Sequence, residues 1–276
     1  MQNRIAEKFR ELAEKGEGAL ICYVVAGYPD TGTSKQVINA LVNGGADIIE
    51  VGIPFSDPIA DGPTIQTASN AALRKGMTPE KALHLVRSVR KQHPSLPLFA
   101  MTYSNILVRA GIEEFMYESK QCGLDGFILP DMPIEEADTY SLTASKLNLA
   151  TVFLVSPNTP EARLRKIVAS TTGFLYVVSV YGITGARNSF QKYTLDTIRA
   201  VKQVSGAKVP VAVGFGISTP AHVKSIIAAG AEAVIIGSAI INKMSDGSGK
   251  KMLEDLRNFA RSMKKACKKK TRTRYI

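Results

Sequence analysis

Eight short apolar segments recur along the chain, and each is followed by turn residues and a longer segment with helical periodicity. Their hydrophobicity is nearly continuous and does not alternate, which is typical of parallel strands covered on both faces. We expect strands over residues 20–26, 47–51, 98–102, 126–129, 151–155, 175–179, 211–213 and 233–236. The repeat therefore predicts a parallel α/β architecture.

Eight strand–helix units in 276 residues indicate one (β/α)8 barrel, whose usual size is roughly 250 residues. We expect this TIM barrel to occupy residues 1–260 as a single domain. It should begin with a helix, because Ile5, Phe9 and Leu12 recur among charged residues at helical spacing. A doubly wound open sheet is the alternative, but the G-x-G-x-x-G fingerprint that it would carry after the first strand is missing.

Capping residues mark the helix boundaries. A threonine that can cap a helix precedes a proline at 78–79, 159–160 and 219–220. Glycines that end helices stand shortly before the next strand at 44–45, 123 and 230. These signals place a helix between successive strands, as a barrel requires.

Two connections are much longer than the roughly 2–6 residues that are usual after a barrel strand. They span 52–77 after the second strand, with a short extra helix expected over 64–73, and 180–193 after the sixth strand. Both follow the carboxyl ends of strands, the face that carries the active site of a barrel. We therefore expect these loops to bind or cover a substrate.

The net charge of +11 is concentrated at the C-terminal end. Residues 250–276 hold eleven Lys or Arg and two acidic residues, so nine of the eleven net charges lie there. We expect residues 261–276 to form a basic, mobile tail. We expect no nucleic-acid partner, because this tail has no aromatic residue before Tyr275.

Cysteine usage and hydropathy bear on the compartment. Three cysteines without C-x-x-C spacing argue against a disulfide framework. The N-terminal residues resemble an amphipathic helix and not a signal peptide, and the apolar run 19–26 is too short to cross a bilayer. We expect a soluble, cytoplasmic protein that does not bind membranes.

The most informative pattern for function lies in residues 47–63, where an apolar strand carrying Glu50 runs into a Pro- and Gly-rich loop carrying Asp57 and Asp61. A carboxylate in an apolar strand is costly to bury unless it is paired or used. The loop can return Asp61 over the strand end, which suits a general acid and a general base on one substrate. The alternative is that Glu50 faces water and that both aspartates only form turns.

Glycine-bearing segments end the last two strands, V-G-F-G-I-S at 213–218 and G-S-A-I at 237–240. Glycines there let backbone N–H groups approach an anion, and a helix that begins near Ser238 offers its positive end. This is the usual phosphate position in a barrel. The alternative is that these glycines only relieve crowding at the strand ends.

Several other chemistries lack the residues they need. No expected strand ends in a lysine, which argues against a Schiff-base aldolase or a pyridoxal phosphate site. The three histidines lie in or just after helical segments without metal-ligand spacing, so we expect no metal. Carboxylate catalysis on a phosphorylated substrate, without a cofactor, remains. Tyr176, early in the sixth strand, either adds a wall or a hydroxyl to this site or is a core aromatic.

Four motifs carry a resemblance to a known family. The segments D-I-I-E-V-G-I-P-F-S-D-P-I-A-D-G-P-T-I-Q at 47–66 and Y-G-I-T-G-A-R at 181–187, with the two glycine-bearing segments, closely resemble the tryptophan synthase alpha chain. The similarity runs in order from about residue 1 to about residue 260. It implies a (β/α)8 lyase that cleaves indole-3-glycerol phosphate to indole and glyceraldehyde 3-phosphate in L-tryptophan biosynthesis.

The resemblance also implies roles for individual residues. Glu50 would be the catalytic acid and base, and Asp61 would hold the indole N–H. The other implied substrate contacts are Tyr176 beside the indole, Thr184 and Gly185 in a closing loop, and Phe215, Gly216, Gly237 and Ser238 around the phosphate.

The family works with a beta chain, a pyridoxal phosphate enzyme that receives indole through a channel. The resemblance therefore implies a tetramer of two alpha and two beta chains, with residues 54–58 and Thr184 communicating with the beta chain. A phosphosugar isomerase on the same barrel is the alternative function, although it has no reason to carry the Glu50 loop. The basic tail and Tyr181 depart from the family pattern.

Overall fold

The structure, a computed structural model, describes residues 3–178 and 187–269, without the side chains of 187–191. Its parallel strands follow the order β5-β4-β3-β2-β1-β9-β8-β7-β6 around one sheet. The strands are β1 (Ala19–Val25), β2 (Ile48–Gly52), β3 (Leu98–Met101), β4 (Gly126–Ile128), β5 (Ala150–Val152), β6 (Leu154–Val155), β7 (Leu175–Val178), β8 (Val211–Gly214) and β9 (Ala233–Ile236). The predicted (β/α)8 barrel is confirmed.

The fifth predicted strand, 151–155, is split in two, and this split closes the barrel. Strand β5 pairs with β4, whereas β6 pairs with β7. Between them, the carbonyl of Phe153 accepts a hydrogen bond of 3.0 Å from the Tyr176 amide. The prediction of one continuous strand was therefore wrong in detail, because its first half pairs with β4 and its second half with β7.

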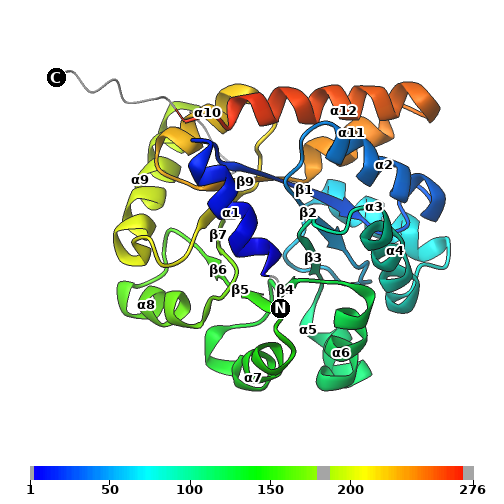
Figure 1. The fold of residues 1–276 in the computed structure, drawn as a ribbon, viewed down its shortest axis with the longest axis horizontal. Coiled ribbons are helices and arrows are strands. Elements are labelled where there is room, and N and C mark those ends of the chain that lie inside the picture. The colour runs from blue at the N-terminus through cyan, green and yellow to red at the C-terminus, as the bar shows by residue number, and fades with distance from the viewer. Residues whose placement is uncertain (1–2, 179–186, 270–276) are drawn as a thin grey trace.

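Helices surround the ring of strands in Figure 1. They are α1 (Arg4–Glu14), α2 (Thr31–Asn43), α3 (Pro63–Arg74), α4 (Pro79–Gln92), α5 (Ser104–Ala110), α6 (Ile112–Cys122), the 3-10 turn η1 (Ile134–Glu136), α7 (Asp138–Leu147), α8 (Glu161–Ser170), α9 (Arg187–Ser205), α10 (Pro220–Ala228), α11 (Ser238–Ser245) and α12 (Gly249–Ala266). The extra helix predicted over 64–73 is α3. Among the described residues, no helix combines the length and apolar character that a membrane crossing needs.

Capping follows the sequence at most of the predicted positions. The hydroxyls of Thr78 and Thr219 accept hydrogen bonds from the amides of Lys81 and His222. Thr159 was predicted to cap α8 in the same way, and this was wrong. Its hydroxyl accepts instead from the Ser156 amide, three residues upstream, so it closes a turn ahead of the helix.

Helix α12 extends the folded barrel past the predicted domain boundary at residue 260. Its buried face continues from Met252 and Leu256 through Met263 to Ala266. Lys264 lies 2.8 Å from Asp47 and 3.0 Å from Glu17, which tie the helix to the strand amino ends. Residues 261–269 therefore belong to the barrel and not to a tail, whereas residues 270–276 lie outside the described part.

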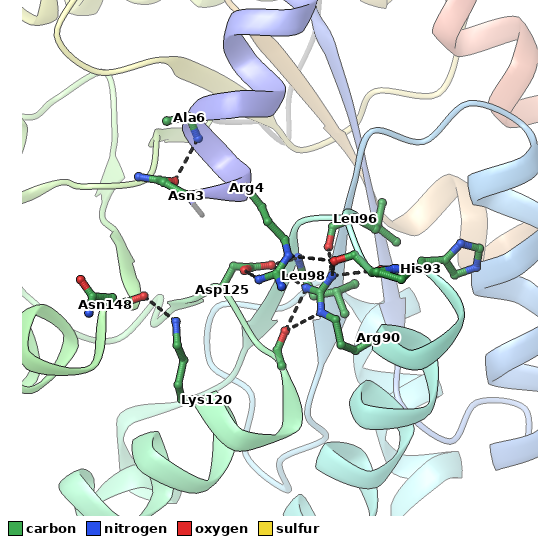
Figure 2. Close-up of polar contacts among 12 residues, drawn as sticks. Asn3, Arg4, Ala6, Arg90, His93, Leu96, Leu98, Lys120, Asp125 and Asn148 are labelled. Carbon is green, nitrogen blue, oxygen red and sulfur yellow. Dashed lines mark hydrogen bonds and ion pairs between the residues drawn. The ribbon is translucent and has the colours of Figure 1, made fainter. Parts of the chain in front are cut away.

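Helix α1 packs against the amino ends of the strands and is fixed there by Asp125. This buried carboxylate receives Arg4 from α1 at 2.8 Å and Arg90 from α4 at 2.7 Å (Figure 2). It also accepts a hydrogen bond from the Leu98 amide, at the start of β3. One acidic side chain thus links two helices to the sheet at the face opposite the strand carboxyl ends.

Removing this carboxylate should destabilise the fold strongly, because two arginines would lose their shared partner in a largely dry environment. We expect Asp125→Ala to lower the free energy of unfolding by about 3–5 kcal/mol in urea titrations. The control is Asp196→Ala, which removes an exposed pair with Arg199 and should cost less than about 1 kcal/mol. Equal losses in the two variants would contradict the proposed role of Asp125.

Candidate active site

Glu50 lies inside the barrel, in the middle of β2. Its side chain is fully buried, and neither carboxyl oxygen has a hydrogen-bond partner among residues 3–178 and 187–269. Burial, with a smaller contribution from the charge of Asp61, raises the pKa of Glu50 to about 8. At neutral pH this carboxyl therefore holds a proton that it can donate.

Asp61 lies in the loop between β2 and α3, and a tyrosine fixes its orientation. The Tyr103 hydroxyl donates a hydrogen bond of 3.0 Å to Asp61 and accepts one of 3.1 Å from the Ala60 amide. Burial raises the pKa of Asp61 to about 6, and the bond from Tyr103 opposes this shift. Asp61 is thus ionised at neutral pH, whereas Glu50 is protonated.

The loop brings these two acids near each other, since the Asp61 charge acts on the pKa of Glu50. Two carboxyls whose pKa values are pushed apart can act as a general acid and an anionic stabiliser on one substrate. Asp57, in contrast, is exposed on the loop with Ser56. Asp57 therefore does not belong to this pair of buried acids.

Two tyrosines lie near the acids, on the strands β1 and β7. A Cβ atom at Gly52 would overlap the Tyr23 hydroxyl, and one at Gly214 would overlap the Tyr176 hydroxyl. The charges of Glu50 and Asp61 both raise the pKa values of these phenols, although burial is the larger cause. Each ring therefore takes the space that a side chain would fill at the end of the next strand.

The ends of β8 and β9 form a corner with unusual backbone geometry. Phe215 and Gly216 have φ angles of 77° and 66°, a left-handed pair that costs a non-glycine residue on the order of 1–3 kcal/mol. The Phe215 ring stands edge-on to Tyr176 at 6.3 Å. Next to this turn, Gly237 precedes α11, whose first amides have no acceptor within the helix.

Such a corner can hold a phosphate. Consecutive residues in this conformation turn their N–H groups toward one side, and a helix amino end favours negative charge. Ser238, the first residue of α11, adds a hydroxyl at the same end. The site thus has an acid pair at one side and a candidate anion cradle at the other.

Comparisons with known proteins identify the family of this barrel. The family model described as tryptophan synthase alpha chain matches residues 9–268. The chain belongs to the tryptophan synthase alpha chain family. A curated alpha chain from Methanosarcina barkeri is 43% identical and aligns over 97% of this chain and 98% of its own length. One from Methanocaldococcus jannaschii is 45% identical over 86% of this chain and 83% of its own.

Solved structures of tryptophan synthase are also similar. An aminoacrylate-bound form from M. tuberculosis superposes with a TM-score of 0.85 at 32% identity, covering 96% of this chain and 99% of that one. A tryptophan synthase complex from Pyrococcus furiosus gives a TM-score of 0.81 at 38% identity, with 90% and 98% covered. The phosphosugar isomerase alternative is not favoured by this family membership.

The structure adds two residues to those that the alpha-chain motifs indicated. Tyr23 and Tyr103 face the acids, but they lie outside the quoted motifs, and Tyr23 sits in an apolar strand that reads as ordinary core. Its position next to Glu50 on a neighbouring strand follows only from the register. Thr184 and Gly185, in contrast, lie outside the described residues.

The raised pKa of Glu50 makes the stability of this alpha-family barrel depend on pH. The unfolded carboxyl titrates near 4.5 and the folded one near 8, so the native state is favoured at low pH and loses this advantage as pH rises through 8. We expect Glu50→Gln to remove this loss of stability at high pH. Its free energy of unfolding should exceed that of the wild type by a few kcal/mol above pH 8 and match it below pH 4.5.

The control for this pH series is Glu11→Gln on helix α1. Lys15 and Lys8 lower the pKa of Glu11 to about 2, so the sign of its effect is reversed. The stability that ionised Glu11 contributes is present above its unfolded pKa and is lost as pH falls through 2. Parallel pH profiles for the wild type and Glu50→Gln would contradict the burial effect at Glu50.

Proposed function

We infer that this chain is a lyase that catalyses the alpha reaction of tryptophan synthase in tryptophan biosynthesis. In detail, we propose retro-aldol cleavage of indole-3-glycerol phosphate to indole and glyceraldehyde 3-phosphate. The observation that carries this proposal is a fully buried Glu50 that has no hydrogen-bond partner among the described residues and whose pKa is raised in part by the charge of Asp61. The ends of β8 and β9, with Gly216 and Gly237, supply the candidate phosphate corner in the same sheet.

The first step uses the proton on Glu50. Indole is a poor leaving group until C3 is protonated, which turns the ring into a cation with its charge at N1. Protonated Glu50 donates to C3, and ionised Asp61 accepts a hydrogen bond from N1–H and stabilises the cation. The bond from Tyr103 fixes Asp61 for this contact.

The second step returns the proton. The Glu50 carboxylate takes the proton of the hydroxyl on the carbon attached to C3. That oxygen forms the aldehyde, the C3–C bond breaks, and its electron pair neutralises the ring. Glu50 is again protonated, and indole and glyceraldehyde 3-phosphate leave.

The remaining contacts orient the substrate. The amides near Phe215 and Gly216 and at the start of α11, with the Ser238 hydroxyl, hold the phosphate. Tyr176 lies beside the indole, and its ring packs against that of Phe215. Thr184 and Gly185 are assigned to loop closure by family resemblance only. No cofactor takes part in the proposed steps.

We propose that the chain acts with a beta chain, and the Pyrococcus furiosus relative is described as part of a tryptophan synthase complex. A tetramer of two alpha and two beta chains is the expected assembly. The side chains of Ile59 and Val108, on the segments after β2 and β3, are 82% and 63% exposed, which suits burial against a partner. A cytoplasmic location remains a prediction.

The function is tested by supplying indole-3-glycerol phosphate and measuring indole release, with and without a beta chain. We expect Glu50→Gln and Asp61→Asn each to lower kcat by at least about 100-fold, since each removes a positioned group. Glu113→Gln, an exposed carboxyl on α6, is the control and should retain full activity. If either site variant turned over substrate like the wild type while correctly folded, its assigned role would be wrong.

A further inference from the structure

Tyr23 occupies a position between the two parts of the proposed site. Its strand, β1, lies between β2 and β9 in the sheet. Tyr23 is the direct neighbour of Glu50 in the parallel register. On the other side, β9 leads into Gly237, where an added Cβ atom would come within 3.2 Å of the Tyr23 ring. The side chain thus connects the catalytic acid to the phosphate corner.

The hydroxyl of Tyr23 reaches further toward the mouth of the barrel than Glu50 does. Side chains two residues apart in a strand face the same side, so Gly52 is the next inward position after Glu50. The space that a side chain would fill at Gly52 is taken by the Tyr23 hydroxyl. This polar group therefore stands directly above Glu50, where a bound substrate would pass.

The Tyr23 hydroxyl is available to hydrogen-bond a ligand. Within residues 3–178 and 187–269 it makes no hydrogen bond, although the side chain is only 5% exposed. Burial, with the charges of Asp61 and Glu50, holds the phenol pKa well above its usual value. The group therefore remains a neutral donor across the working pH range.

A substrate with its ring at Glu50 and Asp61 and its phosphate at Gly237 must pass its middle segment over Tyr23. In indole-3-glycerol phosphate this segment carries two hydroxyls. We propose that the Tyr23 hydroxyl hydrogen-bonds the glycerol hydroxyls and thereby selects substrates with a hydroxylated tail. The assignment rests on the proposed function and adds a specificity-determining residue to it.

The test compares two ligands that differ only in this segment. Indole-3-propanol phosphate has the same ring and phosphate but no hydroxyls on the linking carbons. We expect Tyr23→Phe to lower kcat/KM for indole-3-glycerol phosphate about tenfold, the effect of one lost hydrogen bond. The inhibition constant of indole-3-propanol phosphate should change less than about twofold.

Two further variants make the result specific. Gly52→Ala would displace the Tyr23 hydroxyl and should produce the same selective loss. Tyr140→Phe removes another buried tyrosine hydroxyl, which donates to the Phe127 carbonyl. It should change neither kcat/KM for the substrate nor the inhibition constant of indole-3-propanol phosphate. The proposal would be overturned if Tyr23→Phe reduced kcat/KM for indole-3-glycerol phosphate and the affinity for indole-3-propanol phosphate by the same factor, or if it changed neither. Failure of the wild-type chain to release indole would instead overturn the function on which it rests.

Discussion

The site depends on one costly interaction, the burial of the Glu50 carboxyl without a hydrogen-bond partner among the described residues. A charged carboxylate at this position would lose its hydration with no compensation, so the group keeps its proton at neutral pH. The barrel can tolerate this cost because its stability comes from elsewhere, including the apolar strands and the linked Arg4, Asp125 and Arg90 side chains. Contacts elsewhere in the barrel thus offset the free-energy cost of burying the Glu50 carboxyl.

The parallel register of the strands determines which residues lie next to the buried Glu50 carboxyl. Strands β2, β1 and β9 are neighbours, so Glu50, Tyr23 and Gly237 lie in sequence from the acid to the proposed phosphate corner. The loop after β2 then adds Asp61 from above, held by Tyr103. Small residues at Gly52 and Gly214 leave room for the tyrosine hydroxyls. The geometry of the candidate site therefore follows from the strand order and from the glycines that leave space for the tyrosine rings.

The sequence predicted what depends on local pattern. Continuous apolar runs identified the strands, and the Pro- and Gly-rich loop correctly predicted that Asp61 returns close to Glu50. The catalytic roles of the two acids remain predictions. It did not predict the break at Phe153, because only the closed ring shows that the two halves of that strand serve different neighbours. The domain boundary at 260 was wrong because the tail charges obscured the buried face that runs on through Met263. Tyr23 was missed because an aromatic residue in an apolar strand looks like core until the register is known.

The most direct test of the account is the protonation state of Glu50 itself. Infrared difference spectra across a pH titration report the carbonyl band of a protonated carboxylic acid, and the Glu50→Gln variant identifies which part of the band belongs to this residue. The account predicts a band that persists at neutral pH and disappears near pH 8. A Glu50 carboxyl that is already ionised at pH 6 would contradict it.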